Sequence, residues 1–370
     1  MDKPLAGLKV VELARILAGP WAGQLLADLG AEVIKVERPG AGDDTRHWGP
    51  PFAEDGAAAY FHACNRGKKS IAIDLESRSG QEQVRALVAD ADVLIENFKV
   101  GGLSRYRLDY SALSALNPGL VYCSITGFGQ TGPYASRAGY DFIIQGMGGA
   151  MSLTGEPDGA PQKSGVAYAD LFTGLYSTVA ILAALRARDA SGKGAHLDMA
   201  LLDSQVAVLA NQALNWMVSG KVPHRMGNGH ANLVPYQAFR TSDGEVIIAV
   251  GNDRQFGRLC DMLNLAGLAA DQRYRTNAAR VTNRADLIPL IEAATLRWSR
   301  AELSEALEAA GIPAGPINPV DAVFADPQVS HRGLRIEPDG MPGLASPIVI
   351  DGRRQVSDRR SPLLGEHDPG

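Results

Sequence analysis

The sequence predicts an α/β protein with a parallel β-sheet covered by helices, followed by a smaller α+β domain. Short β-type runs alternate with helical patterns through the first half, which is typical of a parallel sheet. The chain has 370 residues, more than one hydrophobic core usually includes, so a second domain is expected. Residues 221–235 are rich in Gly, Pro, His and Asn and lack apolar periodicity, which indicates a linker or lid.

The first half contains two predicted strand–helix–strand units. Their strands are rich in Val, Ile and Leu, and the first helix ends at a glycine, as helices often do. A further strand follows, and a long apolar helix begins near Asp170. The expected elements are a strand at 8–13, a helix at 21–30, and strands at 31–37 and 69–75, then a helix at 79–91 and strands at 92–98 and 119–129.

The second half begins with a predicted hairpin at 236–251, which turns at Ser-Asp-Gly. Helices are expected near 253–264, 283–296 and 299–310, after which the chain becomes loop-like and then β-like, as if it returned to the first domain. We therefore expect a large domain over 1–220, a small α+β domain with linkers over 221–316, and a C-terminal segment over 317–370 that packs on the large domain.

Composition narrows the class of protein. A net charge of −5 gives no general attraction to nucleic acid or to an anionic membrane. The three cysteines are far apart and the seven histidines show no metal-ligand spacing, so neither a disulfide framework nor a metal site is expected. No export segment and no apolar run long enough for a membrane span is apparent, so a cytoplasmic protein is expected.

Several loops after predicted strands carry residues suited to an anionic ligand. Arg38, Arg46 and Trp48 follow the strand at 31–37, and Arg105 and Arg137 lie in comparable loops. The run GFGQTG matches a dinucleotide-binding pattern, which keeps a nicotinamide-dependent dehydrogenase open. However, Pro133 and a polar stretch follow it where a helix should begin, so a glycine turn lining a ligand cleft is favoured.

Asp170 has two possible roles. An aspartate at a helix start commonly accepts hydrogen bonds from the first backbone NH groups, and it can also act as a nucleophile. Small neighbours, Gly165, Ala167 and Ala169, leave room for a bulky reactant, and the helix dipole is expected to favour the charged carboxylate. Asp141 also precedes an apolar run and competes for the nucleophilic role, so composition alone leaves both aspartates open.

The ordered motifs resemble the family III CoA-transferases, whose members include formyl-CoA and carnitine CoA-transferases. The segments that carry this resemblance span about residues 5–367 and are LKVVELARILAGPWAGQLLADLGAEVIKVERPGAGDDTR, NRGKKSIAIDL, DVLIENF, CSITGFGQTGP, GVAYADLFTGLY and PLLGEH. The resemblance implies a Rossmann-like large domain, a smaller domain, and two chains threaded through each other as an interlocked homodimer. It implies acyl-CoA and a small carboxylic acid as substrates, with no permanently bound cofactor and no nucleic acid or membrane partner.

The resemblance also implies a role for individual residues. Asp170 would be the nucleophile, which passes through a mixed anhydride and an aspartyl-CoA thioester. Trp48 would border the acyl pocket. The residues that would line the CoA site are Ile16, Leu17, Ala18, Arg38, Ala72, Asn97, Phe98, Arg105, Tyr106 and Arg137.

Two features address the reaction and the substrate. Related racemases have a histidine base at the position of Tyr140 in this chain. Without that base, a 2-methylacyl-CoA racemase is only the second alternative, and Tyr140 is instead expected to lie at the substrate site. Within the family, the chain resembles the succinyl-CoA:glutarate CoA-transferase group, which implies dicarboxylates such as succinate, glutarate or itaconate. Arg46 is our hypothesis for the cation that holds the distal carboxylate, and His230 is the alternative.

Overall fold

The computed structural model describes residues 3–368, which divide into two compact units. The first unit contains residues 3–150, 163–210 and 326–368, and the second contains residues 151–162 and 211–325. Residues 151–162 thus group with the second unit, where the backbone NH of Gly227 donates to the carbonyl oxygen of Gly155 at 3.0 Å. The sequence-based domain boundaries did not include this excursion.

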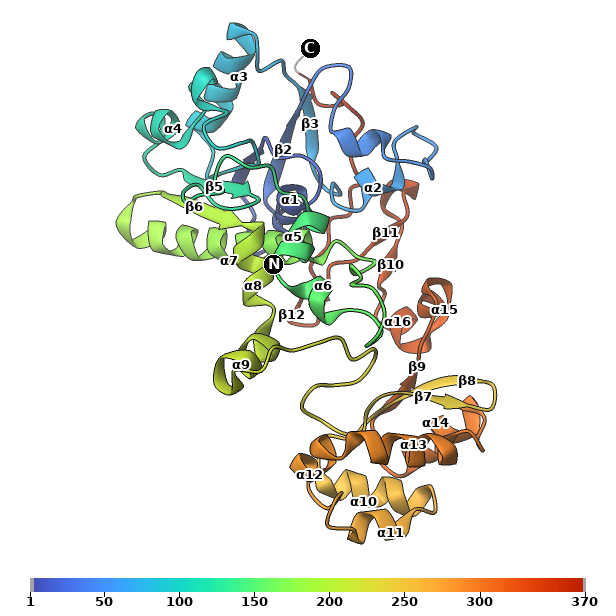
Figure 1. Ribbon diagram of the computed structural model, residues 1–370. Coiled ribbons are helices and arrows are strands. Elements are labelled where there is room, and N and C mark those ends of the chain that lie inside the picture. The colour runs from blue at the N-terminus through green and yellow to red at the C-terminus, as the bar shows by residue number, and fades with distance from the viewer. Residues whose placement is uncertain (1–2, 369–370) are drawn as a thin grey trace. The chain divides into compact units, whose positions relative to one another are not determined.

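A parallel sheet forms the centre of the first unit (Figure 1). Among residues 3–368 it has six strands in the order β3-β2-β1-β4-β5-β6, which confirms the predicted α/β, Rossmann-like architecture. The chain adds strands first on one side of β1 and then on the other, so the order reverses between β1 and β4. Ligands of open α/β sheets bind at such a switch point. The strands are β1 (Lys9–Glu12), β2 (Glu32–Glu37), β3 (Lys69–Ala72), β4 (Val93–Glu96), β5 (Val121–Thr126) and β6 (Ala195–Ala200).

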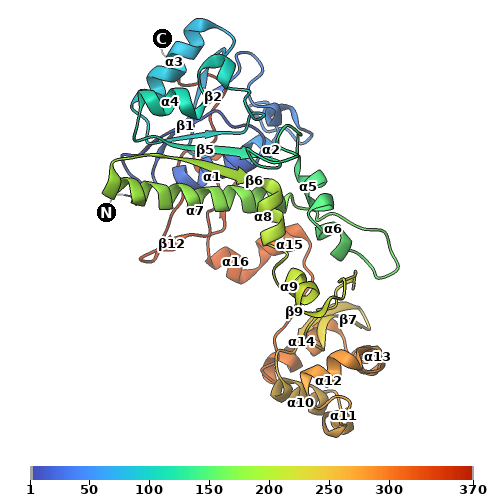
Figure 2. The same cartoon turned by 60° about the vertical axis from the view of Figure 1, so that its left-hand side comes forward.

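Helices cover both faces of this sheet (Figure 2). α1 (Ala18–Asp28) and α7 (Tyr168–Ser191) pack on one face, and α3 (Arg78–Ala89) and α4 (Tyr110–Leu116) lie on the other. Because neighbouring side chains of a strand point to opposite faces, Ile95 belongs to the first of these two cores and Leu94 to the second. Apolar residues therefore occur at successive positions of the strand.

Contrary to the expectation that no apolar run is long enough for a membrane span, the helix α7 is long and apolar enough, by its 24 residues and composition alone, to cross a membrane. It contacts α1, β5 and β6, and its residues Thr173 and Ile181 are fully buried. We therefore regard α7 as a core helix of the first unit.

Shorter elements complete the first unit. The C-terminal segment packs on it, since the backbone NH of Ser357 donates to Asp28 at 2.8 Å and Arg66 donates to the carbonyl oxygen of Leu344 at 2.6 Å. These elements are η1 (Asp44–His47), α2 (Ala59–His62), η2 (Ser104–Tyr106), α5 (Asp141–Met147), α6 (Ala150–Leu153, at the boundary), α8 (Leu201–Ala207), α16 (Pro327–His331), β10 (Arg335–Ile336), η3 (Pro338–Gly340), β11 (Gly343–Leu344), β12 (Val349–Ile350) and β13 (Arg353–Arg354).

The second unit has its own antiparallel sheet and core. The hairpin of β7 (Tyr236–Thr241) and β8 (Gly244–Ala249) lies within the predicted range, and β9 (Ala314–Pro316) pairs with β8. Buried side chains such as Phe239 and Phe256 join the sheet to the helices. The helices are α9 (Ala210–Ser219), α10 (Asp253–Met262), α11 (Ala266–Ala270), α12 (Asn277–Thr282), α13 (Arg284–Thr295), α14 (Arg300–Ala309) and α15 (Val320–Ala325).

Candidate active site

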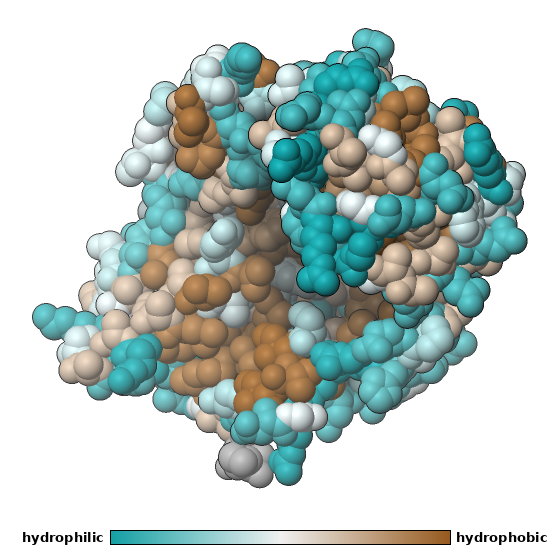
Figure 3. Space-filling model, turned by 90° about the horizontal axis from the view of Figure 1, so that it is seen from below, coloured by the Kyte–Doolittle hydropathy of each residue, from teal (hydrophilic) through white to brown (hydrophobic). Residues whose placement is uncertain are grey.

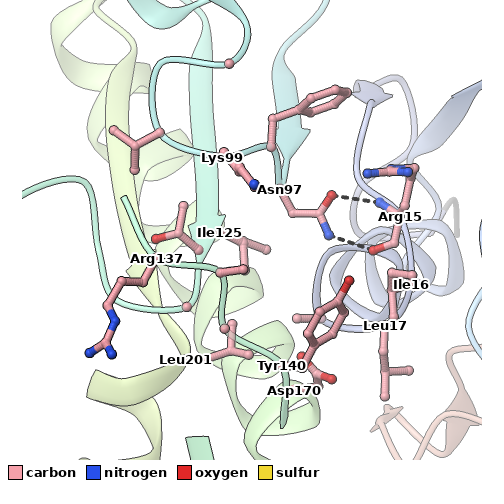
Figure 4. Close-up of a pocket in the computed structure, with 18 of the residues that line it drawn as sticks. Arg15, Ile16, Leu17, Asn97, Lys99, Ile125, Arg137, Tyr140, Asp170 and Leu201 are labelled. Atoms are coloured by element: carbon pink, nitrogen blue, oxygen red, sulfur yellow. Dashed lines mark hydrogen bonds between the residues drawn. The ribbon is translucent and has the colours of Figure 1, made fainter. Parts of the chain in front are cut away.

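A cavity of about 810 Å³ opens in the first unit at the switch point of the sheet (Figure 4). Its walls are the loops that follow β1, β4 and β5, together with the beginning of α7. Ten residues that the sequence analysis named line it, namely Ile16, Leu17, Ala18, Trp48, Asn97, Phe98, Arg105, Arg137, Tyr140 and Asp170. The structure thus brings together residues that are up to 154 positions apart in the chain.

The other residues named from the sequence lie outside the lining. Arg38 is largely exposed beside Asp44, and Tyr106 is buried beneath the guanidinium of Arg105. The backbone NH of Ala72 donates to Asp368 at 2.7 Å. His230 belongs to the second unit, where its Nδ1 accepts hydrogen bonds from the NH groups of Asn232 and Leu233.

The structure does not support Arg46 as a ligand of a substrate carboxylate. Its side chain is buried and donates from Nε and Nη2 to the two carboxylate oxygens of Glu37, at 2.8 and 2.7 Å. Nη2 also donates to the carbonyl oxygen of Pro362, and the guanidinium lies 3.7 Å from the centre of the Phe61 ring. A guanidinium held in this way joins the loop after β2 to the C-terminal segment.

The loop after β1 is held in a strained conformation. Ile16 has φ of 74°, a left-handed value that a β-branched residue rarely adopts. Asn97 fixes one side, because its side chain accepts a hydrogen bond from the NH of Arg15 at 2.9 Å and donates to the Arg15 carbonyl at 2.7 Å (Figure 4). The carboxylate of Asp43 accepts the NH of Ile16 at 3.3 Å from the other side.

Buried charges support this loop from beneath. The ammonium of Lys35 contacts Glu12 at 3.0 Å and Asp43 at 2.9 Å, and Lys68 contacts Glu12 at 2.8 Å, all with fully buried side chains. Burial opposes the charge of Asp43, but the attraction of Lys35 and the hydrogen bonds from Lys35 and Thr45 together outweigh it and lower the pKa of Asp43 to about 2. Asp43 is therefore a carboxylate at neutral pH, when it holds the NH of Ile16.

Asp170 is the third residue of α7, and its side chain lines the cavity beside Leu17 and Tyr140 (Figure 4). Burial, together with the negative charge of Asp141, raises the pKa of Asp170 to about 7. The sequence predicted that the helix dipole favours the charged carboxylate, whereas burial and the like charge of Asp141 favour the protonated form. The carboxylate is more basic than an exposed aspartate.

Asp170 does not cap α7 with its own side chain. The cap position is Ala167, and the carboxylate of Asp141 accepts hydrogen bonds from the NH groups of Ala169 and Asp170 at 2.9 and 3.4 Å. The two roles that the sequence left open are thus divided between two residues. Asp141 caps the helix, and the side chain of Asp170 faces the cavity.

Sequence reasoning missed several residues at the site. The cavity is also lined by Arg15, Asp44 and Lys99. Arg15 lies in the loop that follows β1, and loops at the carboxyl ends of parallel strands typically contact ligands. Tyr60 pairs edge to face with Trp48, with ring centres 5.3 Å apart. Burial and the charge of Asp170 raise the pKa of Tyr60 to about 12, so its hydroxyl keeps its proton near Asp170.

The run GFGQTG forms the loop after β5. α5 begins only at Asp141, so no helix opens at these glycines. Gly127 lines the cavity, and a Cβ at this position would lie 2.6 Å from the Cα of Gly139, so the close approach of the two backbones requires glycine. Within residues 3–368, no group of three His, Cys, Asp or Glu side chains is arranged to hold a metal ion.

Comparison with known proteins identifies the family. The model of CoA-transferase family III matches residues 5–368. The chain belongs to this family. This confirms the resemblance inferred from the ordered motifs, and with it the prediction that the protein is a CoA-transferase that uses acyl-CoA as a substrate.

Relatives of this family III CoA-transferase are similar over nearly the whole chain. A succinate–glutarate CoA-transferase of Agrobacterium fabrum is 57% identical over 98% of this chain and 94% of its own length. A human succinyl-CoA:glutarate CoA-transferase is 44% identical over 99% of this chain and 84% of its own length. The crystal structure of a CaiB/BaiF family protein from Brucella suis superposes with a TM-score of 0.89 at 61% identity, covering 99% of this chain and 98% of that one.

Proposed function

We propose that this CoA-transferase moves CoA from succinyl-CoA to a dicarboxylic acid, glutarate or a close analogue, with Asp170 as the covalent carrier. The observation that carries the proposal is a basic carboxylate, Asp170, that opens into a cavity large enough for an extended ligand. Similarity to enzymes named for succinyl-CoA and glutarate supports the choice of substrates.

The transfer proceeds through two anhydrides and one thioester at Asp170. The carboxylate attacks the thioester carbon of succinyl-CoA, the C–S bond breaks, and a mixed anhydride and the CoA thiolate form. The thiolate attacks the Asp170 carbonyl carbon, which releases succinate and leaves an aspartyl-CoA thioester. The acceptor carboxylate then attacks this thioester and releases the thiolate. Attack of the thiolate on the acceptor carbonyl of the second anhydride gives the new acyl-CoA and restores the carboxylate.

The charges around the cavity are suited to CoA, whose phosphates carry several negative charges. Four cationic side chains line the cavity, Arg15, Lys99, Arg105 and Arg137, against the two acidic residues Asp44 and Asp170. We assign CoA binding to the residues named for it above, including the exposed Arg38 next to Asp44. Ile16, Leu17 and Ala18 would flank the thioester beside Asp170.

The acceptor would lie between Asp170 and the aromatic residues Trp48 and Tyr140, which also line the cavity. Because Arg46 is committed to Glu37, we retain His230 of the second unit as the candidate that the sequence alone offers for the distal carboxylate. Its Nδ1 accepts backbone hydrogen bonds, so in the neutral ring the proton resides on Nε2 and can be donated to a carboxylate.

Trapping of the covalent intermediate tests this function. Incubation with succinyl-CoA followed by hydroxylamine should convert Asp170 to a hydroxamate, found by mass spectrometry on the peptide that contains it. With glutarate present, glutaryl-CoA should form, and it should form faster than the CoA ester of a monocarboxylate of equal length. Label on another residue would refute the carrier, and a preference for monocarboxylates would refute the acceptor class.

We also propose that the enzyme is an interlocked homodimer. Exposed apolar side chains of α5 and α7 support it, namely Phe142, Ile143, Met147, Leu175 and Val179, which are 45–57% exposed. Figure 3 shows that apolar side chains gather in a broad patch on one face of the molecule. A partner chain is the occupant that the family resemblance implies for such a surface.

Replacement of an apolar residue of α7 by a charge should prevent dimer formation. Val179→Asp places a carboxylate in the proposed interface, so light scattering should give the mass of one chain where the wild type gives twice that mass. Gln83→Asp, on the exposed side of α3, is the control and should leave the mass unchanged. A wild type of single-chain mass would show the proposal to be wrong.

A further inference from the structure

Asp141 and Gln145 connect α5 to the segment that carries the nucleophile. Asp141 Oδ1 accepts the NH groups of Ala169 and Asp170, and Asp141 Oδ2 accepts a hydrogen bond from Gln145 Nε2 at 2.7 Å. Gln145 is 1% exposed, and its Oε1 accepts the NH of Ser164 at 2.9 Å. The two side chains therefore hold both ends of residues 164–170.

Residues 164–167, which precede α7, have little other support. Gly165 and Val166 are exposed, and the backbone of these residues otherwise forms local hydrogen bonds, such as that from the NH of Tyr168 to the carbonyl of Val166 at 2.8 Å. The clamp formed by Asp141 and Gln145 comes from a different helix and fixes the position of the Asp170 backbone. Small displacements of a reacting group are costly, because attack requires a narrow range of distances and angles.

The clamp also determines charge at the site. Asp141 places a second carboxylate next to Asp170, and burial together with the charges of both carboxylates raises the pKa of Tyr60, on α2. Repulsion between the carboxylates is present in the free enzyme. It disappears once Asp170 becomes an anhydride or a thioester, since both are neutral. Release of this repulsion favours acylation, because it raises the energy of the ground state but not that of the intermediate.

We propose that Asp141 and Gln145 are positioning residues of the transfer reaction, which hold the backbone of Asp170 and place a second negative charge beside its carboxylate. This inference rests on the proposed role of Asp170 as the covalent carrier. Asp141 is not among the residues that line the cavity. Its effect passes through the amide and the carboxylate of the nucleophile.

The test is the rate at which Asp170 is acylated by succinyl-CoA alone, measured by rapid quenching into hydroxylamine across pH 5–9. In the wild type this rate should fall about tenfold per pH unit below pH 7, because only the carboxylate reacts. Asp141→Asn keeps an oxygen acceptor for the amides but removes the charge. The acid limb of its pH–rate profile, meaning the pH range in which the acylation rate falls as the pH is lowered, should move down by about one pH unit. Its acylation rate at pH 9 should fall about three- to tenfold.

Gln145→Met separates position from charge, since it removes both hydrogen bonds of Gln145 but leaves the carboxyl group of Asp141 in the chain. Its acylation rate should fall about tenfold while the acid limb stays at the wild-type pH. Asp326→Asn is the matched control, because Asp326 caps α16 through the NH groups of Gln328 and Val329 and lies outside the cavity lining. It should change neither the rate nor the limb.

The possible outcomes distinguish this inference from the proposed function. If wild-type Asp170 is not labelled, the covalent carrier is wrong. If it is labelled, but folded Asp141→Asn has the wild-type acid limb, or Gln145→Met reacts at the wild-type rate, the positioning role is wrong. If Asp141→Asn does not fold, Gln145→Met and Asp141→Glu test the positioning role in its place. Asp141→Glu keeps the negative charge, so it should keep the acid limb of the wild type.

Discussion

Replacement of Asp170 by asparagine is expected to lower CoA transfer about 10⁴-fold or more. An amide of nearly the same shape cannot attack a thioester, so both the anhydride and the aspartyl-CoA thioester are lost. The measurement is the steady-state rate of glutaryl-CoA formation from succinyl-CoA, together with the loss of the trapped peptide. Binding of CoA should change little, because the cationic side chains that line the cavity are intact.

Controls distinguish loss of the nucleophile from loss of the fold. Asp189→Asn changes an exposed residue of the same helix and should retain full activity.

The pKa of Asp170 is about 7 in the folded protein and about 4 in the unfolded chain, so ionisation of Asp170 costs stability as pH rises through this window. Asp170→Asn should therefore raise the melting temperature at pH 8 and leave it nearly unchanged at pH 4. Substantial transfer by a folded Asp170→Asn would exclude the proposed mechanism.

The second large effect concerns stability. Lys35→Met should lower the free energy of unfolding by about 3–5 kcal/mol, because the buried carboxylate of Asp43 and one bond to Glu12 lose their cation. Urea denaturation at pH 7 measures this loss. The difference should shrink as pH falls from about 4 toward 2, where Asp43 takes up its proton in the folded wild type as well.

Lys69→Met provides the matched control. Lys69 forms an ion pair with Glu32 at 2.6 Å, but both side chains are about a third or more exposed, so its removal should cost at most about 1 kcal/mol. Lys35→Met should also weaken succinyl-CoA binding at a pH where it remains folded, since Asp43 holds the strained Ile16 in the cavity wall. Equal destabilisation by the two variants would show that the buried network contributes no more than a surface pair.

Much of the fold followed from local patterns. The strands predicted at 31–37 and 119–129 correspond to β2 and β5, and the helices predicted at 253–264 and 283–296 to α10 and α13, each within a few residues. The helix predicted at 21–30 begins three residues earlier, at Ala18, because the residue before it, Leu17, already ends the strained loop after β1. Hydrophobic periodicity reports which face is buried, and it is weakest where an element meets a binding loop.

The candidate site was predicted in part. Ordered motifs identified the family, and ten of the named residues line one cavity, because loops after parallel strands converge at the switch point. The motifs could not distinguish a residue facing the cavity from one committed to a partner. Arg46 illustrates this limit, since its partners Glu37 and Pro362 lie nine and 316 positions away.

The sequence by itself determined the α/β class and the family, and it led to the proposal that Asp170 is the reacting residue, since each depends on residue types in a fixed order. Only the tertiary structure decided that Asp141 caps α7, that Asp170 is desolvated beside a like charge, and that Arg46 belongs to the framework. Hydrogen bonds, burial and Coulomb interactions depend on distance in space. The 28 positions between Asp141 and Ala169 conceal a contact of 2.9 Å until the chain is folded.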